Sequence, residues 1–159
     1  MEFCYLGPSY FITSWRSPSC LLSLLLGDPS TSASSGQLQS VIAVPVNSLK
    51  DNSTLAGIWS GGIDFGVLSK ELQSLNLTAD GKRVVYVGHN GQKISDSDVN
   101  KGKIPESFAN LDSFKSAING LSGSVIDTVN NTKMLVTYHP VNAFHNTWVV
   151  LFMQSLPQK

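Results

Sequence analysis

The end of the chain carries its clearest pattern of apolar and polar positions. Met134, Val136 and Tyr138 recur with a period of two, which is typical of a β-strand with one buried face. Pro140 follows and has no N–H to donate, so we expect it to end this strand. A polar loop and then the apolar run Trp148–Met153 complete the pattern, and such a run is typical of a strand covered on both faces. Together these features predict an antiparallel hairpin on which the rest of the chain packs.

Upstream of this hairpin the apolar period changes from two to 3.6 and back, which indicates a helix between strands. Phe108, Leu111, Phe114 and Ile118 lie three or four residues apart and define the apolar face of this helix. The predicted elements are a strand at Lys82–Val87, a turn at Gly88–Gly91, a partner strand at Gln92–Ser95, a helix at Glu106–Leu121 and a strand at Ser124–Val129. The order predicts an α+β fold over Lys82–Pro157, a five-stranded antiparallel sheet with the Glu106–Leu121 helix on one face.

The first half of the chain shows fewer regular elements. Gln39–Val46 and Leu55–Asp64 are predicted as strands, and Phe65–Leu77 has the apolar spacing of a helix. Asp64 stands directly before that helix, where its carboxylate can cap the first turn. A two-stranded hairpin alone is marginally stable in water, so we expect this half to be loosely ordered or to lean on the second half.

Composition narrows the class of protein. The chain has 159 residues, 42% of them hydrophobic and 14% charged, so it can form a packed core. Lys and Arg number 11, as do Asp and Glu, and this balance argues against nucleic acid or an anionic membrane as partner. The low charge and the many Ser, Thr, Asn and Gly residues suit an extracytoplasmic surface. Cys4 and Cys20 form either a disulfide or two free thiols. The run Leu21–Leu26 is too short to span a bilayer, and we expect it to be partly exposed or to serve as an interface.

The sequence carries no motif that indicates an enzyme. It lacks Gly-x-Ser-x-Gly, a Walker loop, Gly-x-Gly-x-x-Gly and His-Glu-x-x-His. It also lacks Cys and His ligands at zinc-binding spacing. We therefore predict a non-enzymatic module with no catalytic residues, no metal and no cofactor.

The succession of segments resembles the Cache family of PAS-like extracellular sensor domains, in its double form. The resemblance rests on the strand Ile42–Val46 (IAVPV), the strand Leu55–Asp64 (LAGIWSGGID), the turn His89-Asn90-Gly91, and the later Tyr-x-Pro and Trp-Val-Val strands. It covers about Tyr10–Pro157. Cache domains sit outside the membrane in histidine kinases and chemoreceptors, bind small molecules and transmit a displacement to the cytoplasm.

This resemblance implies a division of the chain. Residues 1–64 would be part of a membrane-distal unit, residues 65–77 a linking helix, and residues 78–159 a complete membrane-proximal PAS-like unit. The chain would then be a receptor fragment without the long N-terminal helix, through which a homodimer could form, and without the flanking transmembrane helices. The implied function is sensing of a small molecule of unknown identity. The alternative is a carbohydrate- or protein-binding adhesion module.

Six residues are candidates for ligand contact. The resemblance places Asp64, Tyr10 and Phe11 where amine- and amino-acid-binding members hold their ligands. Asp64 can also act only as a helix cap, and one side chain can serve both roles. The aromatic side chains of Trp59, Tyr86 and Tyr138 can line a small apolar cavity, or they can be ordinary core residues with a hydroxyl or N–H at the edge.

Overall fold

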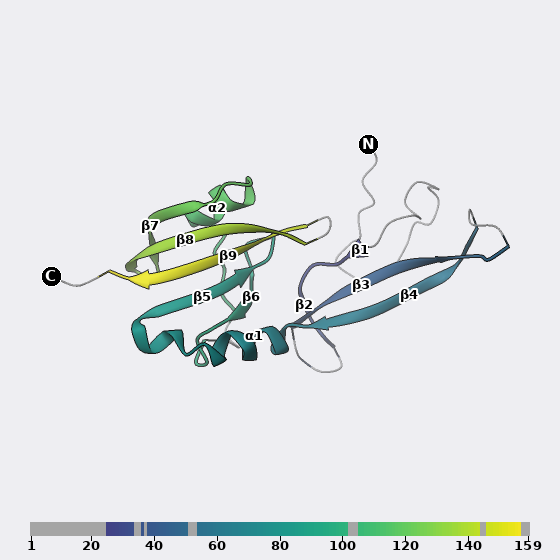
Figure 1. Ribbon diagram of the computed structural model, residues 1–159, viewed down its shortest axis with the longest axis horizontal. Coiled ribbons are helices and arrows are strands. Elements are labelled where there is room, and N and C mark those ends of the chain that lie inside the picture. Colours follow the sequence, from purple (N-terminus) through teal and green to yellow (C-terminus); the bar gives the residue numbers. More distant parts are fainter. Residues whose placement is uncertain are drawn as a thin grey trace.

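The computed structural model describes residues 25–33, 36, 38–50, 54–101, 105–143 and 146–156, and these form two antiparallel sheets joined through one helix. Figure 1 shows the two sheets next to each other along the long axis, with helix α1 running beneath the second sheet. Tyr10, Phe11 and both cysteines lie outside the described residues, so the predictions made for them remain predictions.

The second sheet has five strands in the order β6-β5-β9-β8-β7, and all its neighbouring strands are antiparallel. The α+β architecture predicted from the sequence is therefore confirmed. Its strands are β5 (Lys82–Val87), β6 (Lys93–Asp96), β7 (Gly123–Val129), β8 (Thr132–Ala143) and β9 (Asn146–Ser155).

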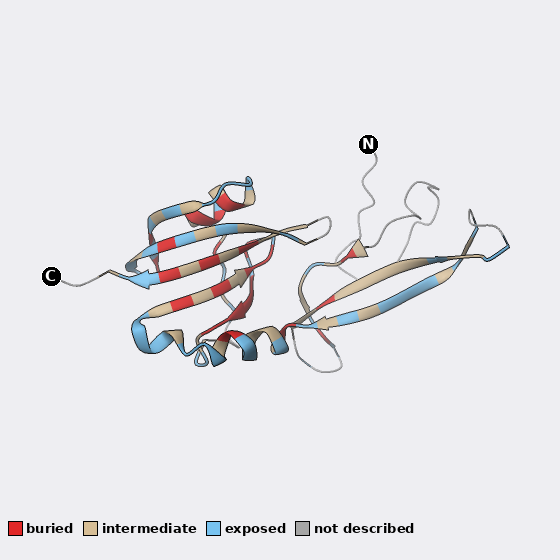
Figure 2. Ribbon diagram, in the orientation of Figure 1, coloured by how far each residue is buried: buried red, intermediate tan, exposed pale blue. Residues whose placement is uncertain are grey.

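One face of this sheet carries the main hydrophobic core. Val85, Val136 and Leu151 are fully buried there because alternate residues of a strand point to the same face. Helix α2 (Asp112–Ile118) covers this face, and Phe108 and Phe114 are buried against it, as predicted. Figure 2 shows the alternation as separate buried bands along β5 and β9.

Strand β8 does not end at Pro140, so that prediction is wrong. Pro140 pairs with Val149 of β9, and the ladder continues to Ala143. Strand β7 reaches only as far as the pair Gly123–Tyr138, so β8 has a single ladder partner at Pro140. The missing N–H of a proline is tolerated on such an edge.

Helix α2 is also shorter than the predicted helix at Glu106–Leu121. The segment before Asp112 is not helical, because part of its backbone binds the edge of the sheet and only a single turn, closed by the Leu111 N–H to the Phe108 carbonyl, precedes the helix. The N–H of Phe108 donates to the carbonyl of Gly91 at 2.8 Å, and the N–H of Lys93 donates to the carbonyl of Glu106 at 2.9 Å. These bonds to distant residues override the helical spacing of the apolar residues.

The first sheet is built on a long hairpin. Strands β3 (Leu38–Asn47) and β4 (Leu55–Asp64) match their predicted positions closely and pair along almost their whole length. Two short strands, β1 (Leu25–Leu26) and β2 (Ser30–Thr31), pair with β3 and were not predicted, because two residues show no period. Leu26 is buried, whereas we expected the Leu21–Leu26 run to be partly exposed or an interface; Leu21–Leu24 lie outside the described residues.

Helix α1 (Phe65–Ser74) starts directly after β4 and contacts both β3 and β6. Asp64 caps it as predicted, because its Oδ1 accepts the N–H of Gly66 at 2.7 Å. The helix ends before the predicted Leu77, where a short 3-10 helix, η2 (Leu77–Asp80), leads into β5. Among the helices in the described ranges, none has the length and apolarity needed to cross a membrane.

The turn at Gly91 gives a test of this fold. Gly91 has a φ of +80°, and an added Cβ would lie 2.5 Å from the Cβ of Ala109. We expect Gly91→Ala to lower the free energy of unfolding by about 1–2 kcal/mol for the left-handed backbone and by about 1–3 kcal/mol more for the clash.

The matched control is Gly120→Ala, because Gly120 has a φ of +86° with nothing within 4 Å of an added Cβ. It should show the backbone cost alone in urea unfolding. Equal losses for the two variants would contradict the close packing of Gly91 on Ala109.

Candidate functional site

The described candidates from the first half of the chain lie on opposite faces of one strand. Trp59 and Asp64 are both on β4, five residues apart, and no register shift separates them. Alternate residues of a strand point to opposite sides, so these two side chains do not meet. Trp59 is 60% exposed and its ring lies against Gly61.

The candidates from the second half are likewise separated by a sheet. Tyr138 pairs with Leu151 and lies on the core face, with its hydroxyl close to Gly123. Tyr86 pairs with Val150, so it lies on the other face. Among the described residues, the structure therefore does not bring the predicted candidates into one cavity.

Asp64 has a different neighbour that the sequence did not suggest. It pairs with Gln39 of β3, so the two side chains share one face of the hairpin. The Oε1 of Gln39 lies beside Gly62, where an added Cβ would be 3.4 Å away. Asp64 is exposed, and only its Oδ1 is engaged in the helix cap. The Asp64 carboxylate, at the start of α1, and the Gln39 side chain, which reaches toward Gly62, therefore lie on the same face of the hairpin.

A second polar arrangement lies within the five-stranded sheet, at its β6 edge. Arg83 of β5 donates to Asp96 of β6 through Nε at 3.1 Å and Nη2 at 2.6 Å. The same guanidinium donates to Glu106 at 3.3 Å and 2.5 Å. Lys93 adds a bond to Asp96 at 3.0 Å and binds the carbonyl of Lys101. We call Arg83, Lys93, Asp96 and Glu106 the charge cluster.

The charged forms of Asp96, Glu106 and Arg83 are stabilised by their partners in this cluster. Burial opposes ionisation of Asp96, but hydrogen bonds from Arg83 and from the Asp98 N–H outweigh it and hold the pKa of this carboxyl below its usual range. Burial likewise opposes ionisation of Glu106, and bonds from Arg83 and Asn130 lower its pKa. The pKa of Arg83 is raised, because its bonds to both carboxylates outweigh the cost of its burial.

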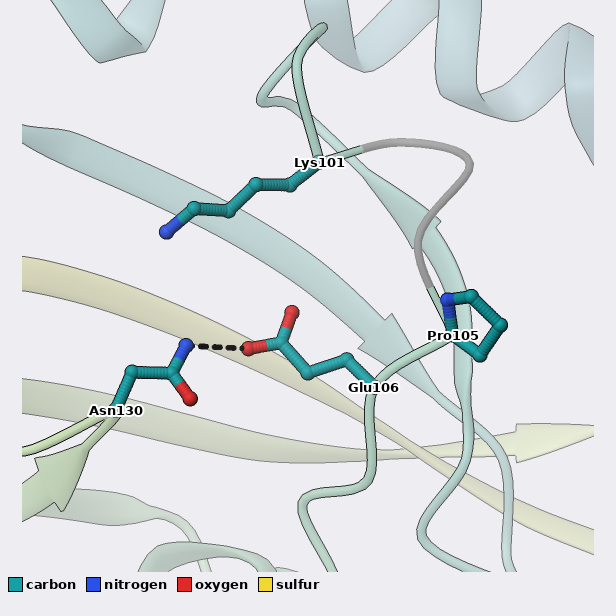
Figure 3. A pocket seen from close by; sticks show the side chains of 4 residues that line it. All are labelled: Lys101, Pro105, Glu106 and Asn130. Atoms are coloured by element: carbon teal, nitrogen blue, oxygen red, sulfur yellow. Dashed lines mark hydrogen bonds between the residues drawn. The ribbon is translucent and has the colours of Figure 1, made fainter.

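Beside the charge cluster, the surface forms a hollow of about 250 Å³ lined by Lys101, Pro105, Glu106 and Asn130. Figure 3 shows that the Asn130 amide points at the Glu106 carboxylate, and the Nδ2–Oε1 distance is 2.9 Å. Glu106 is therefore held by Arg83 and Asn130. The charge cluster holds two cations and two anions that neutralise one another. Its contacts join β5, β6 and the segment at Glu106, which is a structural role.

Sequence reasoning missed this cluster. The available signal was a charged residue at an inward position of a strand, since Arg83 shares its face with Val85 and Val87. A buried charge of that kind requires a partner. In the ranges that the structure describes, no group of three or more His, Cys, Asp or Glu side chains is placed to hold a metal ion.

Comparison with known proteins supports the fold. No protein-family model and no curated protein matches the chain. Solved structures do match it, and among them is the periplasmic sensory domain of the Campylobacter jejuni chemoreceptor Tlp1. That match has a TM-score of 0.66 and 16% identity, and it covers 86% of this chain and 52% of that one.

Two further matches are also receptor domains of low sequence identity and similar coverage. The ligand-binding domain of the Pseudomonas aeruginosa amino-acid chemoreceptor PctC, solved with GABA, has a TM-score of 0.60 and 18% identity, with 86% and 57% coverage. The extracellular domain rpHK1S-Z16, assigned to a histidine kinase, has a TM-score of 0.66 and 15% identity, with 84% and 54% coverage. This chain thus spans about half the length of these structures, and the PAS-like, Cache-type fold expected from its sequence is confirmed.

The charge cluster predicts a large cost for removing one partner. Asp96→Asn leaves Arg83 and Lys93 buried with too little negative charge, which should lower the free energy of unfolding by about 3–5 kcal/mol. Urea unfolding at pH 7 measures this loss. The control Asp112→Asn breaks an exposed pair with Lys115 and should leave stability unchanged. A small effect of Asp96→Asn would show that the cluster contributes little.

The same cluster predicts how stability depends on pH. Asp96 and Glu106 have lower pKa values in the folded state than in the unfolded state. Their contribution is therefore complete above an unfolded-state pKa of about 4 and is lost as the pH falls through the folded-state values. Urea unfolding from pH 7 to pH 2 should show this loss, and Glu106→Gln should make it shallower. An unchanged profile in that variant would contradict the assignment.

Proposed function

We propose that the chain is the extracytoplasmic small-molecule sensing module of a signal-transduction receptor such as a chemoreceptor or histidine kinase. The observation that carries this proposal is the pairing of a PAS-like sheet with a second antiparallel sheet through α1, the fold shared with the sensory domains of such receptors. A receptor of this class is anchored in the membrane by segments that flank its sensor. The adhesion alternative has no comparable support.

We further propose the division of the chain that the sequence suggested. Residues 1–64 belong to a membrane-distal unit, residues 65–77 link the units, and residues 78–159 form the membrane-proximal unit. The separate hydrogen-bonded sheets on either side of α1 support this division.

For the ligand, we propose a small molecule with an ammonium group that is bound at Asp64. The free oxygen of Asp64 and the amide oxygen of Gln39 are two acceptors on one face, and an ammonium group supplies up to three donors. Tyr10 and Phe11 remain predicted contacts. Trp59, Tyr86 and Tyr138 lie on other faces of the two sheets, which favours core or separate roles for them.

The test is a thermal-shift screen of the full chain with amino acids, amines, carboxylates and sugars. A ligand that binds only the folded state raises the melting temperature. Amines or amino acids should raise it, and Asp64→Asn should abolish the shift. Asparagine caps a helix about as well as aspartate, so this variant removes the charge while it keeps the fold.

The matched control for that variant is Asp80→Asn, which changes an exposed carboxylate on η2 and should leave the shift intact. A shift that persists in Asp64→Asn would move the ligand site elsewhere. A response to sugars alone would favour adhesion. Hydrolysis of a test substrate that is lost on a single Ser or Asp substitution would overturn the sensor proposal.

A further inference from the structure

The corner between β1 and β2 contacts the five-stranded sheet at two separate places. The carbonyl of Leu26 accepts a hydrogen bond from Asn146 Nδ2 at 3.1 Å. The Oδ1 of Asp28 lies 3.0 Å from the Nδ1 of His89. We call these four residues the corner latch. Asn146 begins β9 and His89 lies in the turn after β5, and the pair Val87–Val149 places both at one end of the second sheet.

The first-sheet side of the latch is fixed to its own sheet. The N–H of Gly27 donates to the carbonyl of Val41 at 2.8 Å, and the hydroxyl of the fully buried Ser40 donates to the carbonyl of Gly27. Both partners are on β3, which pairs with β4 up to Asp64. The corner therefore moves with the whole hairpin, and a displacement of the hairpin acts directly on the latch.

A second contact between the two sheets lies beside the latch and is apolar. Phe65 begins α1, is almost fully buried, and packs edge-on against Trp148 with 5.5 Å between ring centroids. Trp148 lies two residues after Asn146 on β9. Because Phe65 follows β4 directly, this contact is placed to act as a pivot between the sheets.

The indole of Trp148 is not satisfied in this arrangement. Its Nε1 is buried and has no hydrogen-bond partner among the described residues. A buried donor without a partner is costly. That cost favours an arrangement in which this N–H has an acceptor, so other contacts must hold the present one, and the latch residue Asn146 lies two residues away on the same strand.

We propose that the corner latch holds the two sheets at the angle seen here and that its release lets the first sheet turn about the Phe65–Trp148 contact. The latch is suited to release because the His89–Asp28 pair is partly exposed, with 40% and 55% of the side chains accessible, and exposed pairs are weak. The pivot stays because it is apolar and buried. This device does not depend on which ligand the protein binds.

The test measures the distance between the sheets by pulsed electron paramagnetic resonance. Cys4→Ser and Cys20→Ser remove the native cysteines of the full chain, and Ala56→Cys on β4 with Lys133→Cys on β8 place nitroxide labels at exposed positions. In this background we expect one narrow distance distribution. Adding Asp28→Ala and Asn146→Ala should broaden it or shift its centre.

The control is the pair Asp80→Ala and Asn142→Ala, which makes the same chemical changes at exposed positions outside the latch and should leave the distribution narrow. If the double latch variant no longer unfolds cooperatively, Asn146→Ala alone carries the test, since it removes one hydrogen bond. A latch variant with the narrow distribution of the background overturns the proposal, as does a background that is already broad.

Tryptophan fluorescence gives a second readout. In a Trp15→Phe and Trp59→Phe background, Trp148 is the remaining tryptophan. Loss of the latch should loosen its contact with Phe65 and increase quenching by acrylamide, whereas the control pair should not. Equal quenching in the latch variant and its background would mean that the junction around Trp148 does not respond to the latch.

Discussion

The bond between Arg83 and Asp96 is the interaction on which the arrangement of this molecule depends. Strand β6 is short and lies at the edge of the sheet, with β5 as its single ladder partner. Arg83 and Lys93 hold it from the core face through Asp96. From the other face α1 holds it, because Ser69 and Ser95 share a hydrogen bond of 2.8 Å and Gln73 reaches the Asp96 carbonyl at 3.4 Å. The position of α1, and of the hairpin that leads into it, therefore follows from an edge strand that side chains fix in place.

This dependence gives the proposed ligand site a physical connection to the sheet. Asp64 ends β4 and caps α1, so an ammonium group bound by its free oxygen would act on a residue that already fixes the start of the helix. A shift of α1 bears on β6 through Ser69, and on β9 through Phe65 and Trp148. The proposed ligand site and the second sheet are therefore connected by one element, because the ten-residue helix α1 spans the distance between the hairpin and the β6 edge.

The sequence predicted the elements whose apolar period is unbroken and missed those that are set by distant partners. Strands β3, β4, β5 and β9, the start of α1 and the Asp64 cap all follow from local pattern and local chemistry. Helix α2 was predicted to begin too early, because the backbone of Glu106 and Phe108 binds residues at the β6 edge of the sheet. The end of β8 was misplaced because Pro140 lies beyond the end of β7, where β8 has no ladder partner on that side. The charge cluster joins residues 83, 93, 96 and 106, and the spacing of apolar residues along the chain does not indicate that these distant residues come into contact. The candidate site was predicted in part: Asp64 followed from the family resemblance, whereas its neighbour Gln39 depends on the register of β3 and β4.

The distribution of polar and apolar contacts decides which part of the molecule moves most easily. The core of the second sheet is continuous and apolar, and the cations and anions of the charge cluster neutralise one another. Among the residues that the structure describes, the Phe65–Trp148 contact between the sheets is apolar, whereas the Asn146–Leu26 and His89–Asp28 contacts are polar and partly exposed. Exposed polar contacts exchange readily with water, whereas opening an apolar core exposes surface at about 25 cal/mol per Å². Reorientation of the hairpin relative to a rigid second sheet is therefore the least costly large motion that these contacts allow.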